Sequence, residues 1–199
     1  MSRAVNGDAV LALLLQANRM KVVPRTGWVM RGIADAESVS DHSFGVAFIA
    51  LVLAQVVEQR LDMTKLLTMA LLHDLPEAVL SDVPSPALLY FSADAKTTAE
   101  RDALSAVLAE FPQREQWEIW WQDLEEGASP EAKLVHDADR LDMLLQAYVY
   151  EQTTGNRWLE EFWLDVSRAS FNCDVSRSLF DALCQARERG ARQGSRGES

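Results

Sequence analysis

Apolar residues recur at intervals of three and four along most of this chain, which is the period of amphipathic helices. Val46, Ile49, Ala50, Leu53 and Val57, for example, share one face of a helix. The sequence contains no strict alternation of apolar and polar residues over the length of a strand, no internal repeat and no glycine-rich phosphate loop. We therefore predict an all-α fold.

Start and stop signals divide this pattern into separate helices. Ser129 at a cap position, followed by Pro130, predicts the start of a long helix that ends at Thr154, because Gly155 follows. A helix carrying the apolar face described above is expected to open at Ser40. Further helices are expected over residues 8–20, 64–81, 92–111, 157–168 and 175–189.

The length of 199 residues corresponds to one domain. We assign residues 1–189 to a single helical domain, and we expect residues 190–199, which are rich in Gly, Arg and Ser, to form a disordered tail. Trp117, Trp120 and Trp121 share one helix face, which indicates packing or a subunit contact more than a base-stacking site.

The charge of the chain narrows its possible partners. Nineteen Lys and Arg against 30 Asp and Glu give a net charge of −11, which repels phosphate backbones and anionic lipid. We therefore expect no nucleic-acid partner and no membrane association, and the apolar stretch 10–17 is too short to span a bilayer. Cys173 and Cys184 form no metal or redox motif, so we expect reduced thiols in a cytoplasmic protein.

The strongest chemical signal is the dipeptide His73-Asp74, which ends an apolar run. On a continuous helix, Leu66, Ala70, His73 and Glu77 would form one stripe. A buried imidazole beside a carboxylate is costly unless a partner neutralises the pair, and a divalent cation does so. Taken alone, a His–Asp hydrogen bond without metal is the better reading of the dipeptide.

Two other positions change that assessment. His42 lies one turn before Val46 on an apolar helix face, and Asp139 lies one turn after Val135 on the long helix. Each is explained more simply when taken alone, His42 as a core histidine and Asp139 as a solvated carboxylate. Together with His73 and Asp74, however, they would make a mixed nitrogen and oxygen metal site with open positions.

With these residues the sequence resembles a known family, the HD-domain metal-dependent phosphohydrolases, and among them the HD-domain 5′-deoxynucleotidases. The resemblance covers roughly Leu13 to Phe171 and rests on several short blocks in matching order and spacing. These blocks are RTGW at 25–28, ESVSDH at 37–42, HDLPE at 73–77, DVP at 82–84, and AKLV at 132–135 followed by Asp139.

The resemblance implies a single HD-domain helical bundle and assigns roles to matching residues. The implied metal ligands are His42, His73, Asp74 and Asp139, for a divalent ion such as Co, Mn or Fe. Glu77 matches the catalytic acid, Asp82 a second catalytic carboxylate, and Arg25 and Trp28 the blocks that contact phosphate and nucleoside. The implied reaction is hydrolysis of a deoxynucleoside 5′-monophosphate, a small-molecule nucleotide substrate, by an enzyme that we expect to be a homodimer.

The chain departs from the family pattern in two places. Ser81 stands where the family usually has glycine before the Asp-x-Pro turn. A second dipeptide, His136-Asp137, lies just before Asp139, so Asp137 competes for the role of fourth ligand. On a helix Asp137 and Asp139 lie about 200° apart, so only one of them can face the metal, and the family spacing favours Asp139.

Two other functions stay open at the level of sequence. One is an HD-type hydrolase of another phosphorylated nucleotide, although the chain has no Gly-Tyr-Pro block and is short for a triphosphohydrolase. The other is a non-catalytic sensor that binds nucleotide or metal, which would fit best if Glu77 or a ligand were lost; all of these residues are present. Instead of contacting the substrate, Trp28 could be a core residue and Arg25 a surface cation.

Overall fold

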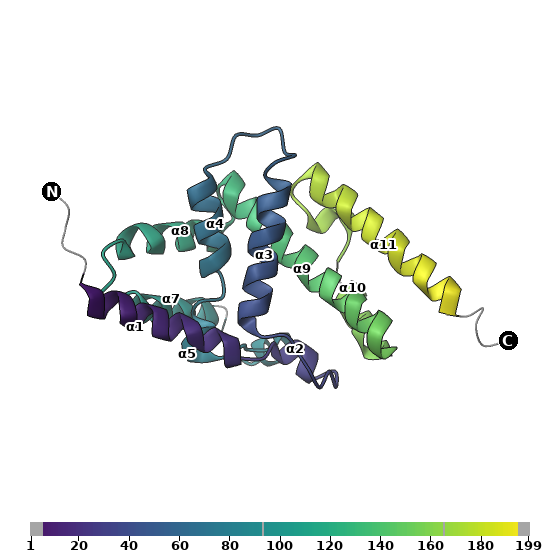
Figure 1. The fold of residues 1–199 in the computed structure, drawn as a ribbon, viewed down its shortest axis with the longest axis horizontal. Helices are drawn as coiled ribbons and strands as arrows, with labels where there is room; N and C mark the ends of the chain where they lie inside the picture. The colour runs from purple at the N-terminus through teal and green to yellow at the C-terminus, as the bar shows by residue number, and fades with distance from the viewer. Residues whose placement is uncertain (1–5, 93, 165, 195–199) are drawn as a thin grey trace.

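The regular structure of the protein is helical. A computed structural model describes residues 6–92, 94–164 and 166–194, and within these ranges every regular element is a helix, apart from one isolated bridge between Pro24 and Ser38 (Figure 1). The predicted all-α class is confirmed. None of the helices in the described ranges is both long and apolar enough to cross a membrane.

The centre of the molecule is formed by α3 (Val39–Leu53), α4 (Met63–Leu72) and α9 (Pro130–Thr154), with α3 packed in front of α9 in Figure 1. The remaining elements are α1 (Gly7–Asn18), η1 (Arg19–Val22), α2 (Thr26–Val29), α5 (Glu77–Leu80), α6 (Ser85–Leu88), α7 (Ala95–Val107), α8 (Arg114–Glu126), η2 (Arg157–Glu160), α10 (Glu161–Leu164), η3 (Arg168–Ser170) and α11 (Asp174–Gly194).

The apolar faces of the central helices supply the main core. Val46 on α3, Leu66 on α4 and Leu141 on α9 are fully buried in one cluster. A second cluster joins α1, α4 and α7 around Trp121 of α8. The central helices are therefore held rigidly on their apolar faces, and side chains at their ends can be positioned precisely.

Local capping explains where the central helices begin. Ser129 accepts the Ala132 N–H, and Gly155 ends α9 in the left-handed region with φ +65°, so both predicted ends of this helix are confirmed. The start of α3 was expected at Ser40 but lies at Val39, because Ser38 and Asp41 form a capping box.

The helix expected over residues 64–81 is interrupted, so that prediction was wrong in one respect. α4 ends at Leu72, and a tight turn follows before α5 begins at Glu77. In this turn the Glu77 N–H donates to the Asp74 carbonyl at 3.0 Å, a three-residue spacing. Pro76 has no N–H to continue an α-helix, which accounts for the break.

The other expected helices form with shifted ends. The helix predicted over 92–111 spans Ala95–Val107, and the segment 157–168 contains the short elements η2 and α10 instead of one helix. α11 continues to Gly194, past the expected end at Arg189. Residues 195–199, the end of the expected tail, lie outside the described residues.

Candidate functional site

The proposed metal ligands come together from three parts of the fold. His42 lies on α3, Asp139 on α9, and His73 and Asp74 in the turn after α4. His42 Nε2 lies 3.1 Å from Asp139 Oδ1 and 3.6 Å from Asp74 Oδ2. His73 Nε2 lies 3.3 Å from the same Asp74 oxygen. The break at Pro76 does not disturb this arrangement, because His73 keeps helical backbone angles.

The hydrogen bonds of the two imidazoles leave their inner nitrogens available to a cation. His73 Nδ1 is 2.8 Å from the Ala70 carbonyl oxygen, and His42 Nδ1 is 2.7 Å from Asp142 Oδ2. Both partners are acceptors, so each Nδ1 carries a proton. Each Nε2 is buried and has no hydrogen-bond partner, although carboxylate oxygens lie nearby. Ligand atoms of His42, His73 and Asp139 lie within 4.8 Å of one another, a donor set that fits a divalent transition-metal ion.

The charges of the cluster also suit a cation. Burial opposes ionisation of Asp74, but His73, Arg25 and His42 hold its pKa well below the ordinary value. Burial is likewise outweighed at Asp139, where the nearby His42 lowers the pKa to about 2. Burial and Arg25 lower the pKa of His42, whereas Asp139 and Asp142 raise it, and the result is about 10. In the metal-free protein His42 therefore carries a proton on Nε2 as well as on Nδ1, and a bound cation would replace the Nε2 proton between two carboxylates that are already ionised.

Glu77 stands beside this cluster as a buried carboxyl group. It is the first residue of α5, its side chain is 8% exposed, and its Oε2 atom has no hydrogen-bond partner. Burial, followed by the charges of Asp74 and Asp82, raises the pKa of Glu77 to about 9. A carboxyl group with this pKa keeps its proton at neutral pH and can donate it.

Arg25 and Asp82 meet at the edge of the cluster. Arg25 Nη1 donates to Asp74 Oδ2 at 3.1 Å and lies 4.0 Å from Asp82 Oδ1. Asp82 also accepts the Thr26 N–H at 2.5 Å, and its carbonyl accepts the Thr26 hydroxyl at 2.9 Å. The described contacts of Asp82 are thus made with the start of α2, where they hold Arg25 in place.

Ser81 has a backbone conformation that usually requires glycine. Its φ of 64° and ψ of 166° fall in a region that costs a non-glycine residue about 1–3 kcal/mol. Its N–H nevertheless closes α5 by donating to the Glu77 carbonyl at 2.9 Å. The backbone of this turn therefore has a conformation typical of glycine although the residue is serine. The turn places Asp82 next to the start of α2.

Trp28 is a core residue that borders a small cleft. Its side chain is 2% exposed, its ring contacts Phe162 and Tyr150, and its Nε1 donates to Glu37 Oε1 at 2.8 Å. The cleft, of about 110 Å³, is lined by Arg25, Gly27, Trp28, Asp82, Val83, Pro84, Ser85, Met143 and Phe162. The ring faces of Trp28 are thus engaged in packing, and its contribution to the cleft is a wall.

Asp137 and His136 lie on other sides of α9. Asp137 is fully buried and accepts the backbone N–H groups of Asn172 and Cys173, at 2.8 and 2.9 Å, where it supports the start of α11. His136 Nε2 is 2.8 Å from the Leu124 carbonyl oxygen. Both residues therefore have structural partners away from the cluster.

Sequence reasoning assigned no role to Asp142 or Glu37, although both belong to this region. Asp142 holds His42, and Glu37 holds Trp28, and ligand atoms of Glu37, His42 and Asp142 also lie within 4.8 Å of one another. The available signal for Asp142 was its position one turn after Asp139 on the same helix. Glu37 precedes His42 in a matching block, but its partner depends on tertiary structure.

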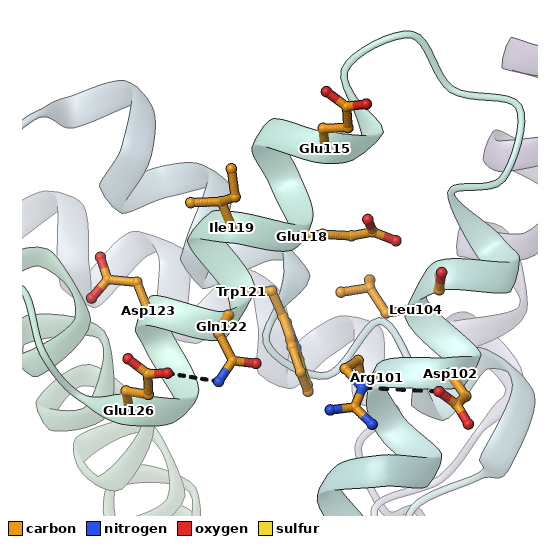
Figure 2. A pocket seen from close by; sticks show the side chains of 11 residues that line it. Arg101, Asp102, Leu104, Glu115, Glu118, Ile119, Trp121, Gln122, Asp123 and Glu126 are labelled. Atoms are coloured by element: carbon orange, nitrogen blue, oxygen red, sulfur yellow. Dashed lines mark hydrogen bonds and ion pairs between the residues drawn. The ribbon is translucent and has the colours of Figure 1, made fainter.

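A larger concavity, of about 780 Å³, lies between α7 and α8 (Figure 2). Three of its acidic side chains have partners: Asp123 pairs with Lys65 at 2.6 Å, Glu118 pairs with Arg114 at 2.9 Å, and Glu126 accepts from Gln122 at 2.8 Å. No histidine lines this concavity. The side chains suited to binding a metal ion therefore lie in the cluster of His42 and His73 and not in this concavity.

Known proteins resemble this chain over most of its length. The model of the HD domain matches residues 17–174. The chain is 33% identical over 185 residues to the 5′-deoxynucleotidase HDDC2 of Danio rerio, covering 92% of this chain and 90% of the relative. It is 37% identical over 145 residues to the HDDC2 protein of Bos taurus, covering 71% and 68%.

A solved structure has a similar fold over most of this chain. The PH0347 protein of Pyrococcus horikoshii OT3 is 38% identical and superposes with a TM-score of 0.74, covering 90% of this chain and 99% of that one. The resemblance seen in the sequence is thus confirmed over most of the chain by the HD-domain match and by the relative from Danio rerio. The chain belongs to the HD-domain family.

Proposed function

We propose that the protein is a metal-dependent 5′-deoxynucleotidase, which hydrolyses deoxynucleoside 5′-monophosphates to the deoxynucleoside and phosphate. The observation that carries this proposal is the convergence of two buried, unpartnered Nε2 atoms with the carboxylates of Asp74 and Asp139, next to the buried carboxyl group of Glu77. The names of the relatives supply the substrate class.

His42, His73, Asp74 and Asp139 would hold the ion, for which Co, Mn and Fe suit the two nitrogen and two carboxylate donors. The bound ion would polarise a phosphoryl oxygen and lower the pKa of a bound water. Arg25 would bind the phosphate, because a guanidinium has five N–H donors and can contact Asp74 and a phosphate oxygen together. Trp28 would form one wall of the nucleoside cleft.

Glu77 would donate its proton to the leaving 5′ oxygen. Hydrolysis adds the oxygen of water to phosphorus and breaks the bond from phosphorus to the 5′ oxygen, which leaves as an alcohol once it is protonated. A buried carboxyl group with a raised pKa is suited to that transfer. Asp82 would hold Arg25 in place through the start of α2 and keep Glu77 protonated by its charge.

The test is phosphate release from deoxynucleoside and ribonucleoside 5′-monophosphates, with Co²⁺, with Mn²⁺ and with a chelator. We expect release with the metals, loss of release with the chelator, and faster turnover of the deoxy substrates. No release from any monophosphate by metal-loaded protein would contradict the proposal. Tight nucleotide binding without turnover would indicate a sensor, and release from other phosphorylated nucleotides alone would indicate another hydrolase of the family.

The enzyme acts as a homodimer in this proposal, through the outward face of α3. That face exposes Phe44, Phe48, Leu51 and Val52, and Val56 is exposed just after the helix ends. The rings of Phe44 and Phe48 stack with centroids 6.1 Å apart. The sequence from 43 to 57 has no charged residue, in a chain of net charge −11. Two strongly acidic copies repel each other least across such an uncharged surface.

We expect Phe48→Glu and Val52→Glu to convert the dimer to a monomer, because each change puts a charge into an apolar interface. Sedimentation should give twice the chain mass of 22.2 kDa for the wild type and one chain mass for the variants. Leu164→Glu, on the exposed surface of α10, is the control and should remain dimeric. A wild-type monomer would disprove the assembly.

We also place the enzyme in the cytoplasm, where nucleotide monophosphates are available as substrates. Cys173 and Cys184 are free thiols, and burial raises the pKa of both, so neither is activated for reaction. Fractionation of cells that express the protein tests this location, and recovery with membranes or outside the cell would contradict it.

A further inference from the structure

The contact between α3 and α9 beside the metal cluster is unusually close. Gly45 lies on α3, one turn after His42, and faces Asp142 of α9. A Cβ atom built at Gly45 would lie 2.0 Å from Asp142 Oδ1 and 2.7 Å from its Cγ. Glycine in the interior of a helix is unfavourable relative to alanine, so its presence here needs a reason from packing.

The reason lies in the hydrogen bond that Asp142 makes. Its Oδ2 atom is 2.7 Å from His42 Nδ1, and its side chain is 14% exposed, so the pair is largely shielded from water. The carboxylate fixes both the plane of the imidazole and the proton on Nδ1. Without that acceptor the ring could turn, and its proton could move to Nε2, the atom that faces the cluster.

Building on the proposed metal site, we propose that Asp142 and Gly45 together are positioning residues for the metal ligand His42. Asp142 aligns the imidazole, and the missing side chain at Gly45 makes the space that Asp142 needs to reach it. A methyl group at position 45 would displace Asp142 and break the bond to His42 without altering either partner of that bond.

The test measures Co²⁺ affinity by calorimetry for the wild type, Asp142→Ala, Gly45→Ala and the double variant. Both single variants should bind Co²⁺ about 10–100-fold more weakly, as is usual when the partner of a metal-binding histidine is lost. The double variant should be no weaker than the weaker single variant, because both changes remove the same hydrogen bond. Asp142→Asn should retain more affinity than Asp142→Ala, since an amide oxygen can still accept from Nδ1.

A matched control is available on α11. Gly190 also lies inside a helix, and a Cβ there would press on the flexible side chain of Gln152 of α9, 3.0 Å away, far from the cluster in sequence. Gly190→Ala should leave Co²⁺ affinity within twofold of the wild type. Melting temperatures of the chelator-treated proteins serve as the second readout, and both glycine variants should remain folded and melt within a few degrees of the wild type.

The outcomes separate this inference from the proposed function. A wild type that does not bind Co²⁺ would refute the metal site itself. A wild type that binds, with both single variants within twofold of it, would overturn the positioning role. A loss in Asp142→Ala alone would overturn the role of Gly45, and additive losses in the double variant would show that the two residues do not act through one bond.

Discussion

Replacing Glu77 by glutamine is expected to lower turnover by roughly 10²–10⁴-fold while the content of bound metal stays at the wild-type level. Glutamine preserves the size of the side chain but cannot release a proton to the leaving oxygen. Glu77 is outside the proposed ligand set, and its Oε2 atom is buried without a partner. Because the lost interaction forms in the transition state, kcat and kcat/KM should fall together.

The assay compares phosphate release from a deoxynucleoside 5′-monophosphate at saturating Co²⁺ or Mn²⁺. Glu131→Gln is a matched control, since Glu131 is also a buried glutamate, 6% exposed, but it bonds the Asp62 N–H at 2.8 Å and lies near Lys65. We expect the control to keep its turnover. Equal turnover in wild type and Glu77→Gln would remove Glu77 from the mechanism.

The same variant should change the pH dependence of stability in the metal-free protein. The ordinary pKa of a glutamate is 4.5, and burial raises that of Glu77 to about 9 in the folded protein. The folded state therefore binds more protons between these values, and the free energy of unfolding falls as pH rises through the window. Glutamine does not titrate, so Glu77→Gln should gain stability relative to wild type between pH 5 and pH 8, by up to about 4 kcal/mol.

Urea unfolding at pH 5 and pH 8, with chelator present, measures this difference. The variant should be closest to wild type at pH 5 and more stable at pH 8. A difference that does not depend on pH would show that Glu77 ionises normally in the folded state. The expected result would show that the protein retains a buried acid for catalysis, although this residue lowers the free energy of unfolding at higher pH.

Local signals explain which parts of the fold could be predicted. Ser129, Pro130 and Gly155 determine the ends of α9 through neighbouring backbone groups, so sequence alone was enough to place them. The His73-Asp74 dipeptide was also visible, because its chemistry is unusual at the end of an apolar run. The break after Leu72 was missed because apolar periodicity continues through it, although Pro76 was the available warning.

Long-range contacts explain what could not be predicted. Asp142 holds a histidine 100 positions earlier in the chain, and Trp28 is enclosed by Tyr150 and Phe162. Both arrangements depend on how α9 and α10 pack against the earlier helices, which periodicity does not specify. The family resemblance supplied the proposed ligand set, but the hydrogen-bond partners of those side chains became visible only in the folded chain.

Two carboxylates on α9, separated by one residue, should respond to the same change in opposite ways. Asp139 lies 3.1 Å from His42 Nε2 with its side chain 38% exposed, whereas Asp137 is fully buried against the start of α11. Asp139→Asn should weaken Co²⁺ binding by at least about 10²-fold, since it removes a charged ligand, and should leave the stability of the metal-free protein nearly unchanged.

Asp137→Asn should have the reverse effect, with normal Co²⁺ affinity and a loss of about 2 kcal/mol or more in the free energy of unfolding. The Asp137 carboxylate accepts the N–H groups of Asn172 and Cys173 as well as the Asn172 side-chain amide. An asparagine there offers one oxygen and turns an NH₂ group toward these donors, so at least one buried donor loses its acceptor. Calorimetry with Co²⁺ and urea unfolding with chelator, applied to both variants, give the two rankings. Loss of Co²⁺ binding in Asp137→Asn with normal binding in Asp139→Asn would move the fourth ligand to Asp137, whereas the contacts at the start of α11 explain why Asp137 faces away from the cluster.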